Sequence, residues 1–87
     1  MNAAFPVLHL YTRKGCCLCE DMEHNIQELL ADLHFALKVH DIDTRADWQQ
    51  RYQTMVPVLT LEEAQQEREI CHYFLDPVAV KQALTTT

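Results

Sequence analysis

The order of hydrophobic patterns along the chain restricts its fold more than any other feature. Residues 5–11, FPVLHLY, form a β-prone run that is apolar on both faces except at His9, as is typical of a central strand covered on both sides. We interpret His9 as a packed, hydrogen-bonded core histidine. From residue 18 onward, apolar residues recur three or four positions apart, which predicts an amphipathic helix. These helix-spaced residues are Leu18, Met22, Ile26, Leu29, Leu30 and Leu33.

The following segments predict three more strands. Residues 35–43, FALKVHDID, alternate between apolar and polar, which predicts a strand with one wetter side. Thr44 and Asp47 have the spacing of a capping box, so a short helix should follow that strand. Residues 55–61 and 67–74 are two further β-prone runs around a polar turn, and we expect them to form a hairpin.

A last helix completes the predicted order. Asp76 and Pro77 suit the N-cap and the first position of a helix. The order is then β-α-β-α-β-β-α over residues 1–87, in a single domain. A β-α-β start implies parallel strands with a right-handed crossover, and the hairpin adds an antiparallel pair. We therefore predict an α/β fold with a four-stranded mixed sheet and helices on both faces.

Composition and charge exclude several classes of function. The 87 residues carry a formal charge of −6, which argues against nucleic acid and anionic membranes as partners, because both recruit basic patches. No apolar run approaches the roughly 18–20 residues of a membrane span. The start MNAAFPVLHLY also lacks the features of a secretory signal. We therefore expect a cytoplasmic protein. We also expect a monomer.

Three of the four cysteines crowd into the stretch KGCCLCE at residues 14–20. Because only Cys71 is distant, at most one disulfide could join remote segments, which argues against a disulfide-stapled domain. On a helix, Cys16 and Cys17 point apart, whereas Cys16 and Cys19 lie on one side with Cβ atoms roughly 5–6 Å apart. A small adjustment brings this last pair within disulfide range.

The predicted helix start favours a reactive sulfur at Cys16. Unpaired N–H groups and the helix dipole favour negative charge there. Arg13 and Lys14 add positive charge, and Gly15 permits an unusual backbone angle or a close approach. The acidic residues at 20–21 oppose the effect. We therefore expect a moderately favoured thiolate at Cys16.

Thiol chemistry gives this pair a mechanism. The Cys16 thiolate attacks a substrate disulfide, and Cys19 then attacks the mixed disulfide and releases the reduced substrate. Cys17 is a spectator or a back-up thiol. The protein is then a thiol–disulfide oxidoreductase whose substrate is a disulfide of a protein or of a small thiol.

Two other hypotheses use the same residues differently. One is a metal or iron–sulfur site with Cys16, Cys19, Cys71 and His72 as ligands. The spacing of these ligands is unusual, because zinc sites generally combine two pairs of ligands, each pair closely spaced in the sequence. A cysteine on a strand, such as Cys71, is also more often a small buried hydrophobic residue. The other is a non-catalytic binding module that uses a groove beside Val56 and Pro57.

The motifs resemble a known family. The stretch LYTRKGCCLCEDM after the first strand, and MVPVL at the start of the third, are similar to the glutaredoxins of the thioredoxin superfamily. The likeness is greatest to small bacterial glutaredoxin-like proteins with a Thr-Arg-x-Gly-Cys-x-Leu-Cys motif, and it spans about residues 7–84. The resemblance implies a thioredoxin-like fold and disulfide oxidoreductase activity. It also implies no bound cofactor, with glutathione as a possible co-substrate.

The resemblance also implies roles for individual residues. Cys16 corresponds to the nucleophile and Cys19 to the resolving cysteine. Val56-Pro57 corresponds to a cis-proline turn, whose outward backbone could pair with an extended substrate. Arg13 and Asp76 lie where the family contacts glutathione, and Arg13, Lys14, Gly15, Val56, Pro57 and Asp76 are the predicted substrate-binding residues.

The chain departs from the family pattern at two places. Cys17 and Leu18 replace the Pro-Tyr of typical glutaredoxins between the two cysteines. The diglycine that precedes the last helix is also missing, and CHYFLD at residues 71–76 stands in its place. We expect the side chains at 71–73 to obstruct a glutathione pocket.

Overall fold

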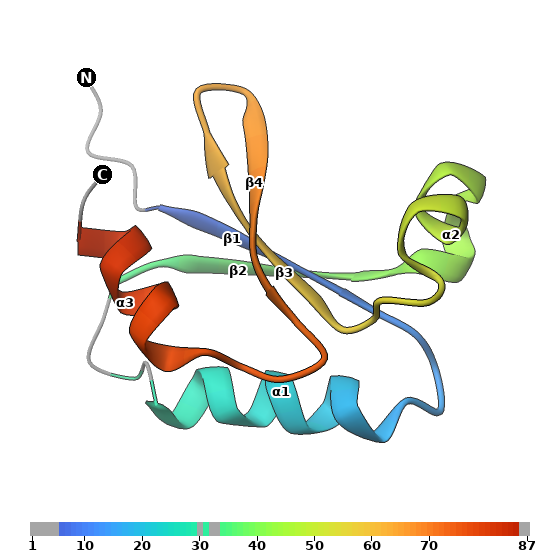
Figure 1. The fold of residues 1–87 in the computed structure, drawn as a ribbon, viewed down its shortest axis with the longest axis horizontal. Coiled ribbons are helices and arrows are strands. Elements are labelled where there is room, and N and C mark those ends of the chain that lie inside the picture. Colours follow the sequence, from blue (N-terminus) through green and yellow to red (C-terminus); the bar gives the residue numbers. More distant parts are fainter. Residues whose placement is uncertain (1–5, 30, 32–33, 86–87) are drawn as a thin grey trace.

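The computed structural model describes residues 6–29, 31 and 34–85. Its elements follow the predicted order, with one short 3₁₀ helix added (Figure 1). They are β1 (Val7–Thr12), α1 (Cys17–Leu29), β2 (Ala36–Asp41), η1 (Ile42–Thr44), α2 (Ala46–Tyr52), β3 (Val58–Glu63), β4 (Gln66–His72) and α3 (Pro77–Thr85). The predicted strand residue Phe5 and the predicted helix residues Leu30 and Leu33 lie outside the described residues.

The four strands form one mixed sheet in the order β2-β1-β3-β4. β1 is parallel to β2, and β3 is antiparallel to β4, as predicted. The structure also shows that β1 is antiparallel to β3. Tyr11 near the end of β1 lies opposite Val58 at the start of β3. The loop that leaves β1 and the loop that enters β3 therefore lie at the same end of the sheet.

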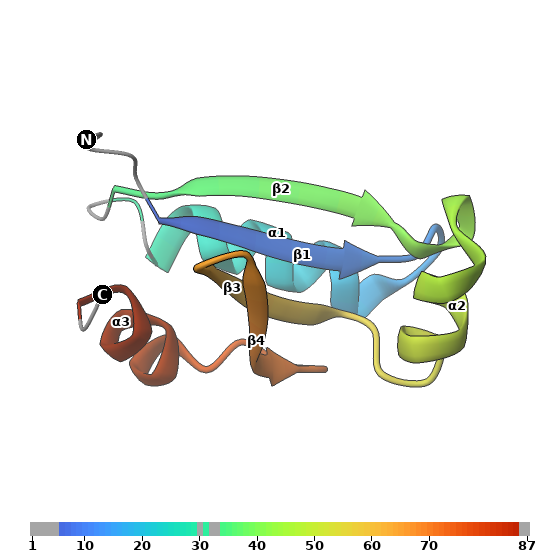
Figure 2. The same cartoon turned by 90° about the horizontal axis from the view of Figure 1, so that it is seen from above.

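Helices cover both faces of this sheet, and the alternation of side chains along each strand separates the two cores. Leu8, Leu10, Leu59 and Leu61 pack with α1 and α3 on one face. Tyr11 and Val58 point to the opposite face and pack with Ile42 and with Tyr52 of α2. Seen from above, α2 lies beyond the ends of β1 and β2, so it covers only that end of its face (Figure 2).

The part of the second face that α2 does not cover is polar. His9 is only 7% exposed, and its two ring nitrogens lie 2.8 Å from His40 Nε2 and 2.8 Å from Glu62 Oε1. Glu67 accepts hydrogen bonds from Tyr11 and from Thr60. The interpretation of His9 as a hydrogen-bonded core histidine is confirmed.

This histidine pair predicts that stability depends on pH. Burial, and then the nearby charge of His9, lower the pKa of His40 from its ordinary value of 6.5, while Glu67 acts in the opposite direction. The unfolded chain therefore binds a proton at His40 more readily than the folded chain does. As a result, the free energy of unfolding should fall as the pH falls below about 6.5. Thermal unfolding from about pH 7.5 to about pH 5 measures the slope. His40→Gln should flatten it, and an unchanged slope would contradict this origin.

The predicted capping box at Thr44 and Asp47 is wrong. Thr44 is the last residue of the 3₁₀ helix η1, and its hydroxyl donates to the Asp41 carbonyl instead. The N-cap of α2 is Arg45, without a side-chain cap. Asp47 instead accepts two hydrogen bonds from the Arg45 guanidinium, at 3.0 and 3.1 Å.

The hairpin strands differ from the prediction at their ends. β3 begins at Val58 rather than residue 55, because the Val56 N–H donates to the Tyr52 carbonyl and Pro57 has no N–H to give. β4 ends at His72 rather than residue 74, where Tyr73 turns the backbone to a φ of +67°. The turn itself is short: only residues 64–65 separate the strands, both with positive φ.

The last helix begins as predicted. The Asp76 carboxylate accepts the Ala79 N–H at 3.1 Å, and α3 starts at Pro77. Among the described helices, none combines the length and the apolar content that a membrane crossing requires.

Candidate redox site

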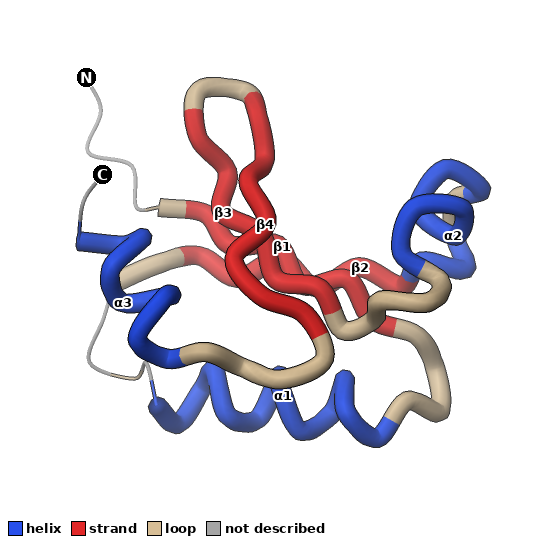
Figure 3. The backbone as a smooth tube through the Cα atoms, viewed as in Figure 1, coloured by secondary structure: helices blue, strands red, loops and turns tan. Residues whose placement is uncertain are grey.

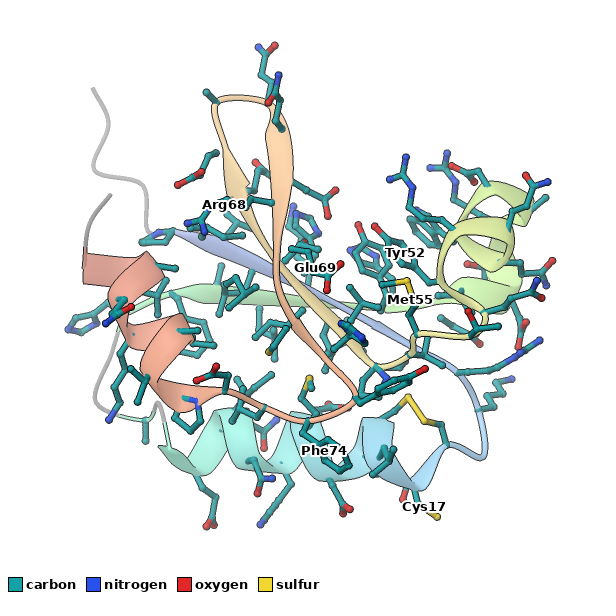
Figure 4. All side chains as sticks on the ribbon, viewed as in Figure 1. Cys17, Tyr52, Met55, Arg68, Glu69 and Phe74 are labelled. Carbon is teal, nitrogen blue, oxygen red and sulfur yellow. A yellow bond between two sulfur atoms is a disulfide. The ribbon has the colours of Figure 1, made fainter. Side chains whose placement is uncertain are left out.

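Cys16 and Cys19 form the chemical centre of the candidate site. A disulfide joins them, with Cα atoms 5.2 Å apart, at the N-terminal end of α1 (Figure 4). The structure therefore confirms which of the crowded cysteines pair. Cys17 is exposed, and its side chain points away from that disulfide (Figure 4).

The helix start places the Cys16 sulfur among backbone donors. Cys16 is the residue just before α1, and its Sγ accepts the Cys19 N–H at 3.1 Å, as an N-cap side chain does. Its carbonyl accepts the Glu20 N–H at 3.2 Å. Cys16 is partly exposed, whereas Cys19 is only 2% exposed. The two cysteines thus differ in their access to solvent.

The loop between β1 and α1 contains three of the predicted substrate-binding residues. Gly15 has a φ of +75°, and a Cβ there would meet nothing within 4 Å, so the backbone angle and not a close approach requires glycine. Lys14 is exposed. The Arg13 guanidinium pairs with Asp43, with Nη2 3.1 Å from Oδ1. Hydrogen bonds from Arg13 and then Gln49 lower the pKa of the Asp43 carboxyl.

The Val56–Pro57 turn lies at the same end of the sheet as this loop, since Val58 pairs with Tyr11. The peptide bond between Val56 and Pro57 is cis, and Pro57 is fully buried. The N–H of Val56 donates to the Tyr52 carbonyl at 3.1 Å. This donor is therefore already used within the protein, and the pairing of the Val56 backbone with an extended substrate stays a prediction.

A shallow, open pocket lies at the junction of β4 and α3, and His72, Phe74 and Asp76 are among the residues that line it. Cys71 also borders it, is half-buried and packs against the main core. Burial raises the pKa of the Cys71 thiol, which is typical of a cysteine that packs as a small hydrophobic residue. Within residues 6–29, 31 and 34–85, no three His, Cys, Asp or Glu side chains gather as metal ligands do.

The comparisons with known proteins agree with this geometry. Residues 7–85 match the family described as Glutaredoxin-like domain (DUF836). The chain belongs to this glutaredoxin-like family. No curated protein matches it.

Solved structures place the glutaredoxin-like chain within the thioredoxin fold. The solution structure of protein Ne2328 from Nitrosomonas europaea is 33% identical, with a TM-score of 0.80 over 97% of this chain and 96% of that one. Target protein XcR50 from X. campestris is 28% identical, with a TM-score of 0.66 over 92% and 97%. Oxidized mitochondrial thioredoxin 3 from Saccharomyces cerevisiae, at 17% identity, has a TM-score of 0.70 over 98% and 81%. The last likeness shows the fold alone.

Two residues of this glutaredoxin-like site were not predicted from sequence. Asp43, which holds Arg13, was assigned to a strand, and the motif around Arg13 gives no signal of its partner. Thr54 accepts a hydrogen bond from the Tyr73 hydroxyl, a contact across nineteen positions. From the sequence, Tyr73 was expected only to obstruct a glutathione pocket, because it lies where the family has its diglycine.

Proposed function

We propose that this glutaredoxin-like protein is a thiol–disulfide oxidoreductase that uses Cys16 and Cys19. The observation that carries the proposal is the disulfide between them at the start of α1, with one cysteine partly exposed and the other buried. A helix start stabilises a thiolate through its N–H groups and dipole. The Cys19 N–H, which already points at the Cys16 sulfur, supports that role.

The reaction then proceeds in two exchanges. The Cys16 thiolate bonds to one sulfur of the substrate disulfide, and the other sulfur leaves as a thiolate that takes up a proton from water. Cys19 loses its proton and attacks Cys16 Sγ, which forms the Cys16–Cys19 disulfide and expels the second substrate sulfur. Two electrons pass from the dithiol to the substrate, and a separate thiol reductant must restore the pair.

The choice of reductant and compartment is part of the same proposal. The two side chains that the family resemblance assigns to glutathione already have partners here: Arg13 pairs with Asp43, and Asp76 caps α3. This favours a site in which glutathione is a co-substrate at most and not a tightly held ligand. The free thiols of Cys17 and Cys71 favour a reducing compartment such as the cytoplasm.

Equilibration across a redox series of dithiothreitol, and separately of glutathione, tests this function. Mass spectrometry of the alkylated protein should show Cys16 and Cys19 converting together from two thiols to one disulfide, while Cys17 and Cys71 stay alkylated. The glutathione series also shows whether an adduct forms on Cys16. A metal-bound protein in which the pair resists oxidation would support the metal-site alternative, and a pair that never exchanges would support the non-catalytic module.

A further inference from the structure

Tyr73, the first residue after β4, has a backbone conformation that a bulky residue rarely adopts. Its φ is +67°, in the left-handed region. Strain of this kind persists only where surrounding bonds impose it, and it concentrates at functional sites. The residue is also 41% exposed, so burial is not what holds it in place.

Two hydrogen bonds hold Tyr73 against the segment that leads into β3. Its N–H donates to the Pro57 carbonyl at 2.9 Å, and its hydroxyl donates to the Thr54 carbonyl. One residue thus bonds to both ends of segment 54–57, and its ring must run along that segment. Segment 54–57 and the residues after β4 belong to two different loops (Figure 3).

Other backbone groups of segment 54–57 are also used within the protein. The N–H groups of Met55 and Val56 both donate to the Tyr52 carbonyl, at 2.8 and 3.1 Å, and Pro57 has no N–H. A peptide that adds as a strand needs such donors and acceptors. A peptide that pairs through these N–H groups, or through the Thr54 or Pro57 carbonyl, would have to displace an existing bond. The Tyr73 hydroxyl is the partner that a side-chain rotation alone would release.

We propose that Tyr73 is a specificity-determining residue that holds segment 54–57 closed to substrate backbones. This inference rests on the proposed function. Segment 54–57 and the Cys16 loop lie at the same end of the sheet, so a polypeptide in exchange with Cys16 would run past Tyr73. Small disulfides need no backbone pairing and react with Cys16 directly. Disulfides within an extended polypeptide react slowly until the Tyr73 hydroxyl leaves Thr54.

Two probes with the same leaving group test this selection. One is 2-hydroxyethyl disulfide, and the other is an unstructured peptide whose single cysteine is disulfide-linked to 2-mercaptoethanol. In both, Cys16 Sγ bonds to one sulfur of the probe, the other sulfur leaves as a thiolate, and Cys19 then expels the sulfur held by Cys16. Each Cys16–Cys19 disulfide formed therefore releases two molecules of 2-mercaptoethanol from the small disulfide, and one molecule together with the peptide thiol from the peptide disulfide. Single-turnover rates are measured with reduced protein, by quantifying the 2-mercaptoethanol released.

Tyr73→Phe removes only the hydroxyl that reaches Thr54. The peptide rate should rise about fivefold, the effect expected for the loss of one hydrogen bond, while the rate with the small disulfide stays within about twofold. Tyr73→Gly suits the positive φ and also removes the ring, so it should raise the peptide rate further. Tyr11→Phe is the matched control, because its hydroxyl donates to Glu67 and not to segment 54–57; its ratio of rates should match wild type.

Three results would decide against the inference or its basis. If Tyr73→Phe and Tyr73→Gly change both probes equally, or leave the peptide rate unchanged, Tyr73 does not select substrates. If Tyr11→Phe raises the peptide rate as much as Tyr73→Phe does, the effect is not specific to Tyr73. If the wild-type protein reacts with neither probe, the proposed function itself fails, whatever the Tyr73 variants do.

Discussion

The Cys16→Ser variant loses disulfide exchange, to below about 1% of the wild-type rate, because a serine hydroxyl neither ionises near neutral pH nor forms a disulfide. The cysteine sulfur accepts the Cys19 N–H at the start of α1, and serine is a good N-cap residue that can accept the same hydrogen bond. The substitution therefore removes the attacking atom and keeps the cap. Release of 2-mercaptoethanol from 2-hydroxyethyl disulfide measures the loss.

Cys17→Ser is the matched control for this result. Cys17 is the neighbouring residue, it is exposed, and its side chain points away from the disulfide (Figure 4). This variant should keep at least about half of the wild-type rate, because the attacking thiolate is untouched. Similar losses in the two variants would contradict the assignment of the nucleophile to Cys16. Retained activity in Cys16→Ser would do so as well.

Local sequence patterns were sufficient to predict the element order and the pair of cysteines that forms the disulfide. The change from a β-prone run to residues spaced three or four apart marks β1 and α1, because each period follows from the geometry of its own backbone. The pairing of Cys16 with Cys19 depends on the same helical geometry. Asp76 and Pro77 likewise predicted the start of α3 from two adjacent residues.

The contacts that shape the surroundings of the site were beyond such patterns, because they join residues far apart in the chain. Arg13 meets Asp43 across thirty positions, and Tyr73 meets Thr54 across nineteen. Each contact depends on strand register and on where a strand stops, which no short motif encodes. The capping box predicted at Thr44 and Asp47 did not form for a related reason. The spacing was suitable, but the Thr44 hydroxyl donates to the Asp41 carbonyl instead.

Ile26→Ala should lower the free energy of unfolding by about 2–5 kcal/mol, as is usual when a large buried side chain is truncated. Ile26 is fully buried with Met22 in the core beneath α1, on the helix face that also buries Cys19. Urea denaturation of the reduced protein measures the change. Val78→Ala, on α3 and 64% exposed, is the control and should change stability by no more than about 0.5 kcal/mol. If both variants cost the same, α1 does not pack on the sheet through this face, and the burial that distinguishes Cys19 from Cys16 loses its structural basis.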